Sequence, residues 1–359
     1  MITVNQAYRK VQVNGQTLLA DYGDVEAEVV AVRTGVGVID RSAWGRVQLT
    51  GADRLPFLQR MSTNDFSQLP VGLGKPTVFP DARGRMVDRA LVYGWEDETL
   101  LVGSLGSHKR LAGWLRQYIF FRDKVAVADL TADTGMLTVY GPQAVETVRA
   151  ALGEAETEFL DDEFVRRYQF MPVAEAETLV AGADPLGGQG VNLIVEPGRV
   201  AELWARLIEA GATPIGYAAY DRLRIEAGWP EYGHEITDAY NPLEAGLLSA
   251  VSFTKGCYIG QEVVARLDTY QKLKQHLMGL RFSQPEVDAA PGTRLELDGK
   301  AVGVLTSVAP APDGAVGLGY VRVSCAIASV TVTVTTPDGC FAAALADLPG
   351  RWQRPYGLE

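Results

Sequence analysis

Hydrophobic residues recur every three or four positions in some stretches of the chain, and in others they alternate with polar residues or run together. The first pattern is typical of amphipathic helices, and it predicts helices over 24–37, 52–65, 107–120, 142–152, 198–210 and 217–227. Short apolar runs bounded by turn residues predict strands, at 45–51, within 76–104, and at 136–140, 169–173, 178–182 and 191–195. This mixed order, with hairpin-like turns, favours an α+β fold over a regular βαβ array.

The pattern changes after about residue 275. Runs of β-branched residues, such as 329–336, are separated by turn sequences rich in Pro, Asp and Gly, and no helical spacing interrupts them. This indicates an all-β terminal domain, either a sandwich or a barrel. We therefore divide the chain into an N-terminal α+β part (1–130), a middle α+β part (131–275) and a C-terminal β part (276–359), with the first two free to interleave in space.

Length and charge narrow the class of protein. The chain has 359 residues, which is more than one hydrophobic core usually serves. The formal charge of −11 disfavours general nucleic-acid binding, because an acidic surface repels phosphate. The N-terminus lacks the apolar segment of a secretion signal, and no apolar run reaches the length of a membrane span. We therefore expect a cytoplasmic protein that does not enter the membrane.

The cysteines point to one candidate site. Cys257, Cys325 and Cys340 are too few and too widely spaced for a disulfide framework or a structural zinc site. Cys257 differs from the others because Lys255 lies two residues before it and a helix is expected near Gly260. A nearby ammonium and a helix N-terminus both favour the thiolate, which makes Cys257 a candidate for the reactive group, with Lys255 as the residue that favours its thiolate. The alternative is a small residue packed where the chain turns between glycines.

A second candidate site lies in the segment "YDRLRIEAGWPEYG". Arg222 and Glu226 are four residues apart on a predicted helix and share a face, where a surface ion pair is the simplest interpretation. The functional alternative is that Arg224 and Glu226 reach a pocket beside Trp229 and Tyr232. A guanidinium suits a carboxylate, and aromatic faces suit a flat ring.

Asp88 is a third candidate. It lies in the middle of a predicted strand, between apolar residues of the run "RMVDRALV". Such an aspartate either faces solvent or points into a cavity, where it can hold or take a proton.

Taken together, these stretches resemble the glycine-cleavage T-protein superfamily, and specifically its YgfZ branch of folate-binding proteins linked to iron–sulfur cluster maintenance and tRNA modification. Residues 39–65, 222–236 and 241–247 resemble three of the family's segments, and "GKAVGVLTSVAPAP…GLGYVR" resembles its terminal barrel. The most specific match is "KGCYIGQE" at 255–262, which fits the K-G-C-[FY]-x-G-Q-E signature of the YgfZ branch. True aminomethyltransferases typically have a K-x-D-F-I-G type run there.

The resemblance implies three domains around a central channel that holds tetrahydrofolate or a one-carbon-substituted tetrahydrofolate, with a C-terminal β-barrel. It implies that Asp88 lies beside the folate nitrogens and that Arg224 holds the pterin or its tail. Tyr232 and Glu226 become channel residues by the same likeness. Gln261 and Glu262 join the folate-site residues and shape the loop around the cysteine, although they also suit an ordinary first helical turn.

The chain also departs from the family. Arg89 replaces the second aspartate of the family's "G-G-x-x-D-D" segment, and Gly188 and Asn192 stand where the "G-E-D-G-F-E" segment has acids. Without that glutamate the paired donors of a pterin lose a charge-assisted acceptor. Aminomethyl transfer is therefore disfavoured, and folate binds more weakly or through another acceptor.

We expect a YgfZ-like protein that binds folate and supports iron–sulfur cluster assembly or repair, with cluster-assembly proteins as its partners. If it is an enzyme, it is a folate-dependent one-carbon transferase. One alternative is an aminomethyltransferase of the glycine cleavage system. The other is a non-enzymatic adaptor whose folate site has decayed and whose cysteine loop faces a partner.

Overall fold

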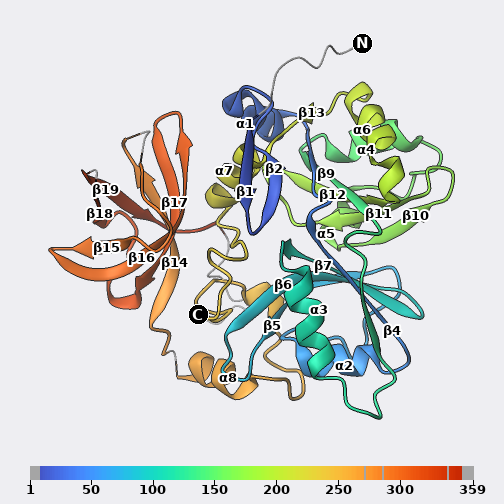
Figure 1. The fold of residues 1–359 in the computed structure, drawn as a ribbon, viewed down its shortest axis with the longest axis horizontal. Coiled ribbons are helices and arrows are strands. Elements are labelled where there is room, and N and C mark those ends of the chain that lie inside the picture. The colour runs from blue at the N-terminus through green and yellow to red at the C-terminus, as the bar shows by residue number, and fades with distance from the viewer. Residues whose placement is uncertain (1–8, 271, 285–286, 338, 350–359) are drawn as a thin grey trace.

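The computed structural model describes residues 9–270, 272–284, 287–337 and 339–349. These residues form a five-stranded sheet, a six-stranded sheet, a closed six-stranded barrel and one hairpin (Figure 1). The predicted α+β class and the C-terminal β-barrel are both confirmed. Every helix within the described ranges is too short or too polar to cross a membrane.

The five-stranded sheet is antiparallel throughout. Its strands lie in the order β5 (Gly74–Pro80), β6 (Met86–Gly94), β7 (Glu98–Leu105), β4 (Trp44–Thr50) and β8 (Ala126–Asp129). Helices α2 (Arg54–Met61) and α3 (His108–Gln117) share one core with this sheet. Phe57 and Leu58 of α2 and Leu115 of α3 are fully buried there, so the apolar stripe of each helix is what attaches it to the sheet.

The six-stranded sheet takes strands from distant parts of the chain. Its order is β10 (Phe170–Val173), β11 (Thr178–Ala183), β12 (Gln189–Val195), β9 (Gly135–Gly141), β3 (Gly37–Asp40) and β13 (Thr213–Pro214). Strand β3 precedes the whole five-stranded sheet in sequence, yet it pairs with β9 and β13. Helices α4 (Ala144–Leu152), α5 (Asp162–Arg166) and α6 (Val200–Glu209) share a core with it.

The other face of the six-stranded sheet packs toward the five-stranded sheet. Because side chains alternate along a strand, Leu137 and Val139 of β9 join the core under α4 and α6, while Met136 and Tyr140 join a second core. That second core also contains Leu91 of β6 and residues of α1 (Val25–Thr34). The space between the two sheets is therefore a shared interior.

Helix α7 (Tyr217–Ala227) connects this interior to the barrel. It ends at Gly228, whose left-handed conformation (φ 68°) is the usual helix stop for glycine. Helix α8 (Gln261–Thr269) begins directly after Gly260, within the "KGCYIGQE" run, as expected. The remaining elements are the hairpin β1 (Lys10–Val13) and β2 (Gln16–Leu19) and three short 3-10 helices, η1 (Pro197–Arg199), η2 (Leu248–Ala250) and η3 (Val323–Cys325).

The barrel closes in the order β14 (Gln275–Phe282), β17 (Gly314–Arg322), β16 (Lys300–Ala311), β15 (Arg294–Leu297), β18 (Thr331–Thr336) and β19 (Gly339–Ala346). Closure leaves no unpaired sheet edge. Gly314 makes the β16–β17 turn possible, because its φ is 134° and a Cβ there would lie 1.9 Å from the carbonyl oxygen of Phe282. Tyr320 and Leu318 of β17 pack with Ile225 of α7, which fixes the barrel against the rest of the molecule.

Several element boundaries differ from the sequence prediction. The helix predicted over 24–37 ends at Thr34, and residues 37–40 form β3 instead. The helix predicted over 52–65 ends at Met61. Strand β8 and helix α5 have only four and five residues, too few to show a periodic pattern, and were not predicted.

Candidate functional site

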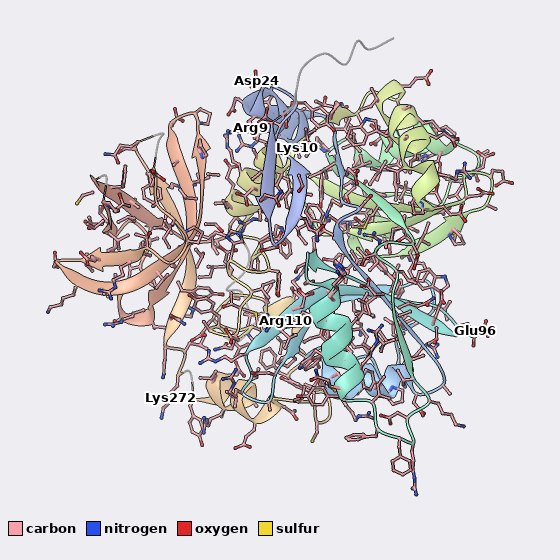
Figure 2. The ribbon with its side chains drawn as sticks, in the orientation of Figure 1. Arg9, Lys10, Asp24, Glu96, Arg110 and Lys272 are labelled. Carbon is pink, nitrogen blue, oxygen red and sulfur yellow. The ribbon has the colours of Figure 1, made fainter. Side chains whose placement is uncertain are left out.

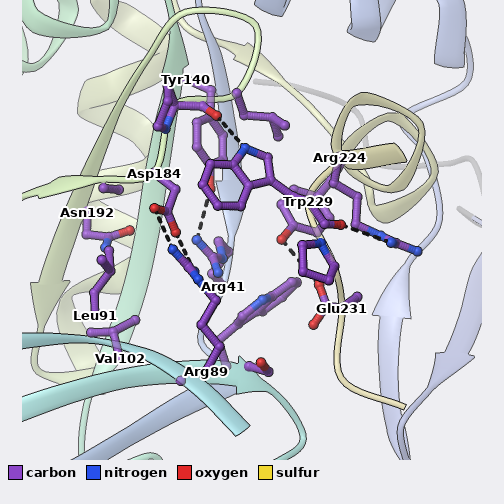
Figure 3. A pocket seen from close by; sticks show the side chains of 18 residues that line it. Arg41, Arg89, Leu91, Val102, Tyr140, Asp184, Asn192, Arg224, Trp229 and Glu231 are labelled. Atoms are coloured by element: carbon purple, nitrogen blue, oxygen red, sulfur yellow. Dashed lines mark hydrogen bonds and ion pairs between the residues drawn. The ribbon is translucent and has the colours of Figure 1, made fainter. Parts of the chain in front are cut away.

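A cavity lies where the two sheets, α7 and the segment after α7 meet (Figure 3). It is partly open to solvent. The residues around it come from eight separate parts of the chain: Arg41, Trp44, Arg89, Leu91, Val102, Gly103, Ser104, Tyr140, Ala183, Asp184, Pro185, Leu186, Asn192, Tyr220, Arg224, Trp229, Pro230 and Glu231. Apolar and aromatic walls with a few charged groups are typical of a small-molecule site.

A bidentate ion pair crosses the cavity. Both terminal nitrogens of Arg89 on β6 contact the carboxylate of Asp184, at 2.6 and 2.8 Å (Figure 3). Tyr168 donates to the same carboxylate at 3.1 Å, and the Arg89 guanidinium carbon lies 4.9 Å from the centre of the Trp229 ring. Burial opposes the charge on Arg89, but Asp184 outweighs it and raises the arginine pKa.

Arg41 is the second arginine of the cavity. It donates to the hydroxyl of Tyr140 at 2.9 Å, and its guanidinium carbon lies 4.8 Å from the centre of the Trp44 ring and 5.6 Å from that of Tyr220. Burial opposes its charge, yet the neighbouring oxygens of Tyr140 and Tyr220 raise its pKa. Within the described residues, the buried Nε atoms of Arg41 and Arg89 have no hydrogen-bond partner. Buried donors normally have one, so this cavity suits a ligand that carries acceptors.

Glu231 provides a carboxyl group on the α7 side of the cavity. It is 4% exposed, and its two contacts are long: the Tyr220 hydroxyl at 3.3 Å and the Leu105 backbone nitrogen at 3.4 Å. Burial raises the Glu231 pKa, and Arg224 and Arg41 oppose this shift.

Arg46 fixes the loop that carries Arg41. Its side chain is fully buried and donates to the carbonyl oxygens of Ser42, Trp44, Thr131 and Thr134 at 2.6–2.9 Å. Burial lowers the Arg46 pKa to about 10. These bonds tie the connection between β3 and β4 to the connection between β8 and β9, so the loop holds one shape.

Asp88 is buried on β6, next to the cavity wall. It accepts from the Ser107 hydroxyl at 2.5 Å and from the Arg89 backbone nitrogen at 2.8 Å. A Cβ on Gly103, which lines the cavity, would lie 3.0 Å from an Asp88 oxygen. Burial raises the Asp88 pKa, and hydrogen bonds from Ser107 and Ser104 oppose the shift. The solvent-facing alternative for Asp88 is therefore wrong, and the carboxyl group lies behind the wall at Gly103.

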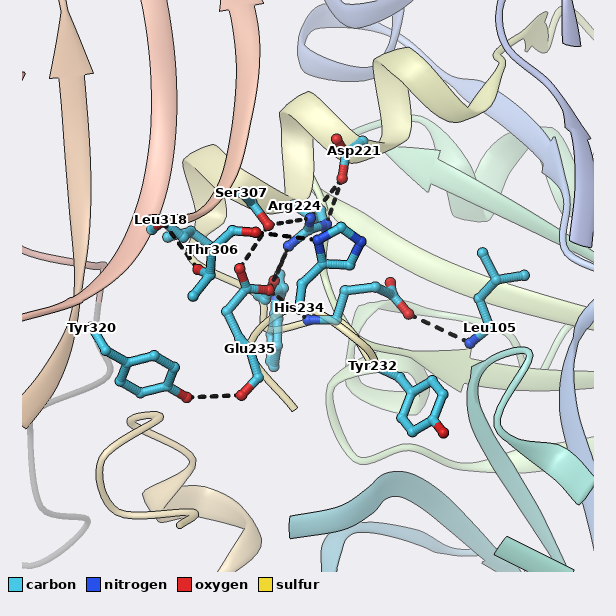
Figure 4. A network of polar contacts seen from close by, with 12 residues as sticks. Leu105, Asp221, Arg224, Tyr232, His234, Glu235, Thr306, Ser307, Leu318 and Tyr320 are labelled. Carbon is cyan, nitrogen blue, oxygen red and sulfur yellow. Dashed lines mark hydrogen bonds and ion pairs between the residues drawn. The ribbon is translucent and has the colours of Figure 1, made fainter. Parts of the chain in front are cut away.

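Arg224 lines the cavity, but its donors already have partners inside the protein (Figure 4). It bonds to Asp221 at 2.7 Å, to Glu235 at 2.9 Å and to the hydroxyl of Ser307 on β16 at 2.8 Å. Arg224 lowers the pKa of Glu235, against the effect of burial. This network joins α7 to the barrel. Arg224 therefore has a structural role.

Glu226 and Tyr232 lie away from the cavity lining. Glu226 pairs with Arg222 at 3.0 Å, as the shared helix face predicts, and also with Arg33. Tyr232 contacts Arg110 of α3, which Figure 2 labels, with 3.4 Å between the hydroxyl and a guanidinium nitrogen. Of the three channel residues expected on this segment, only Arg224 lines the cavity.

The cysteine loop is a separate place on the molecule. Cys257 is exposed, and no residue of 255–262 is part of the cavity lining. Lys255 is 7% exposed and donates to the carbonyl oxygens of Ser62 and Asn64 at 2.8 and 2.5 Å. Burial lowers its pKa to about 8. The ammonium therefore anchors the loop to the end of α2, and its effect on the thiol stays a prediction.

Gln261 and Glu262 begin α8 directly after this loop. The Gln261 backbone nitrogen donates to the Tyr258 carbonyl at 3.1 Å, and Glu262 is exposed. Neither residue lines the cavity, and their part in a folate site stays a prediction. In the part of the chain that the structure describes, no three His, Cys, Asp or Glu side chains gather as metal ligands.

Sequence reasoning missed most of the cavity. Arg41, Tyr140, Asp184 and Tyr220 come from four separate parts of the chain, and none of the four was singled out as a site residue, although Arg41 and Tyr220 lie in segments that drew attention. Trp229 was expected beside a pocket and does line it, with its indole nitrogen 3.0 Å from the Pro185 carbonyl oxygen. The signal that could have found Arg41 is its place directly after a buried strand, in the run "VIDRSAW".

Comparison with known proteins places these features in context. The family model described as the GCVT N-terminal domain matches residues 4–255. A chloroplastic protein of Arabidopsis thaliana named as a transferase is 33% identical over 335 residues, covering 92% of this chain and 75% of the relative. The aminomethyltransferase of Herpetosiphon aurantiacus is 31% identical over 316 residues, covering 88% and 86%.

The fold also has a solved counterpart. The glycine cleavage system aminomethyltransferase T of Bartonella henselae superposes with a TM-score of 0.83, covering 98% of this chain and 96% of that one. The two sequences are 22% identical, so this likeness establishes the T-protein-like fold and not the activity.

Proposed function

Because the chain belongs to the family of the GCVT N-terminal domain, whose members use tetrahydrofolate, we propose that its central cavity binds tetrahydrofolate or a one-carbon derivative. The observation that carries the proposal is a pair of arginines, Arg41 and Arg89, that line the cavity together with Trp44, Tyr220 and Trp229. Within the described residues, the buried Nε donor of each has no hydrogen-bond partner. A pterin is a flat ring with acceptors along its edge, and aromatic walls suit such rings. Tetrahydrofolate, when bound, would accept a one-carbon unit and a substituted tetrahydrofolate would supply one; the residues of this chain would hold and orient it.

We further propose a YgfZ-like role in iron–sulfur cluster assembly or repair and in tRNA modification. The support is the "KGCYIGQE" loop, which presents Cys257 at the surface and holds its own shape through the buried Lys255. A thiol that is exposed and separate from the cavity is available to a partner protein, and cluster-assembly proteins in the cytoplasm are the partners we expect. In this proposal the cavity binds the folate on which the activity depends, and the cysteine loop contacts the partner protein.

An aminomethyltransferase is the second candidate, and observations on both sides bear on it. The buried Asp88 beside the cavity favours it, as do the names of several relatives. Against it, Asp184 is neutralised by Arg89, and Asn192 offers a neutral amide whose oxygen already accepts from Thr138 at 2.7 Å. Folate-dependent release of ammonia from an aminomethyl-lipoyl carrier protein would establish this activity. No release with a competent carrier would remove it.

A complementation experiment tests the proposed role. In a strain that lacks its own YgfZ-type protein, the wild type is expected to restore the activity of a cluster-dependent enzyme. Arg41→Gln and Cys257→Ala are each expected to reduce the restored activity roughly tenfold, because the first removes a charge-assisted donor from the cavity and the second removes the thiol. The control is Arg167→Gln, an exposed arginine in an ion pair with Glu163.

The outcomes separate the alternatives. Full restoration by Cys257→Ala would remove the cysteine assignment. Full restoration by Arg41→Gln, with loss only in Cys257→Ala, would favour an adaptor that acts through the loop without folate.

A further inference from the structure

The lining of the cavity contains two carboxylates and one side-chain amide: Asp184, Glu231 and Asn192. Two of the three have their acceptor oxygens occupied. Asp184 takes both nitrogens of Arg89 and the hydroxyl of Tyr168. The oxygen of Asn192 accepts from Thr138, and its nitrogen donates to the hydroxyl of Tyr93 at 3.3 Å.

Glu231 differs from both. A carboxylate has about four acceptor positions, and Glu231 receives only the two long contacts from Tyr220 and Leu105, at 3.3 and 3.4 Å. No arginine is hydrogen-bonded to it within the described residues, although it is almost fully buried. A buried carboxyl group with spare acceptor positions is costly unless a ligand completes it.

We propose that Glu231 is the acceptor that recognises a ligand with two adjacent N–H donors, namely the aminopyrimidinone edge of a reduced pterin. This inference rests on the proposed function and names the side chain that recognises the pterin ring through hydrogen bonds. A ring N–H and an exocyclic amino group point the same way from that edge, and two carboxylate oxygens match them in a paired geometry. Trp229, two residues before Glu231, also lines the cavity, and its ring provides an aromatic surface (Figure 3).

The assignment has a consequence for specificity. A ring in which a carbonyl oxygen replaces the exocyclic amino group places an acceptor opposite the carboxylate. Sites built on paired hydrogen bonds reject such analogues strongly, because their own buried polar group is then left unpaired. The cavity should therefore separate pterins from otherwise similar pteridine-diones.

The test uses fragments of the ligand under anaerobic conditions. Wild-type protein is titrated calorimetrically with 6-methyltetrahydropterin, with the matching tetrahydropteridine-2,4-dione and with p-aminobenzoylglutamate. The last is the tail of folate without the pterin ring. Glu231→Gln, which keeps the shape of the side chain, is expected to weaken pterin binding by about tenfold to a hundredfold. It is expected to leave p-aminobenzoylglutamate within about threefold of wild type, because the tail does not meet this edge.

The control is Glu202→Gln, an exposed glutamate of α6, which should bind both fragments as the wild type does. Unchanged pterin affinity in folded Glu231→Gln would overturn the inference and leave the proposed folate function standing. Failure of the wild type to bind either tetrahydrofolate or the pterin would overturn both. If Glu231→Gln does not fold, the wild type decides alone: a preference of tenfold or more for the pterin over the dione supports Glu231, and equal affinities overturn it.

Discussion

Replacing Arg224 with methionine is expected to lower the free energy of unfolding by about 3–5 kcal/mol, the cost of breaking a buried ion pair by removing one partner. Glu235 is fully buried and would lose the positive charge that compensates its carboxylate, although the hydrogen bonds from the Ser307 hydroxyl and the Glu231 backbone nitrogen would remain. Because Ser307 belongs to the barrel, the same change weakens the attachment of α7 to the barrel. Urea denaturation followed by circular dichroism measures the effect.

A second substitution isolates the cause. Adding Glu235→Gln to Arg224→Met is expected to recover part of the lost stability, because it removes the unpaired charge. The control is Arg167→Met on the surface, which should change the unfolding free energy by less than about 0.5 kcal/mol. If Arg224→Met were as stable as the control but failed to bind folate, Arg224 would be a ligand-holding residue and not a structural one.

Replacing Arg46 with methionine is the other change with a large expected effect, again about 3–5 kcal/mol of unfolding free energy. Four carbonyl oxygens, one buried and three partly buried, would lose this donor. A buried acceptor left unsatisfied costs about 1–3 kcal/mol, and removal of the buried charge offsets part of the total. The loop that presents Arg41 and Trp44 to the cavity would then lose its fixed shape. Thermal and urea denaturation measure the stability.

Arg46→Lys separates geometry from charge. Lysine keeps the charge but has one nitrogen with three donors, so it cannot reach acceptors on both connecting loops. An intermediate loss of stability is expected. A lysine variant as stable as the wild type would show that the positive charge alone accounts for the stability. The four hydrogen bonds from Arg46 to carbonyl oxygens would then not be what positions the loop.

The sequence predicted the elements whose apolar spacing is long and regular. Helix α6 was expected with Leu203 and Leu207 on one face, and both are buried under the six-stranded sheet. The β-branched runs of the C-terminal part were enough to predict an all-β domain. Strand β3 was missed because it has four residues and its partners are β9 and β13, about 100 and 175 positions further along the chain.

The cavity was harder to predict because its chemistry depends on contacts between sheets. Nothing in the local sequence shows that Arg89 of β6 meets Asp184, or that Glu231 is left with spare acceptor positions. Arg224 was singled out from its segment, but its buried partners Glu235 and Ser307 come from a following turn and from the barrel. The role of each of these residues depends on a partner from another helix, strand or loop. Such partners are known only once the chain has folded.

Calorimetric titration of the wild-type protein and of Arg41→Gln with tetrahydrofolate tests the central claim most directly. The account predicts saturable binding of one equivalent to the wild type, and affinity lowered about tenfold to a hundredfold in Arg41→Gln through loss of a charged donor and its aromatic contacts. No saturable binding by the wild type would contradict the proposal that the cavity is a folate site. Equal affinity in the two proteins would show that folate binds elsewhere.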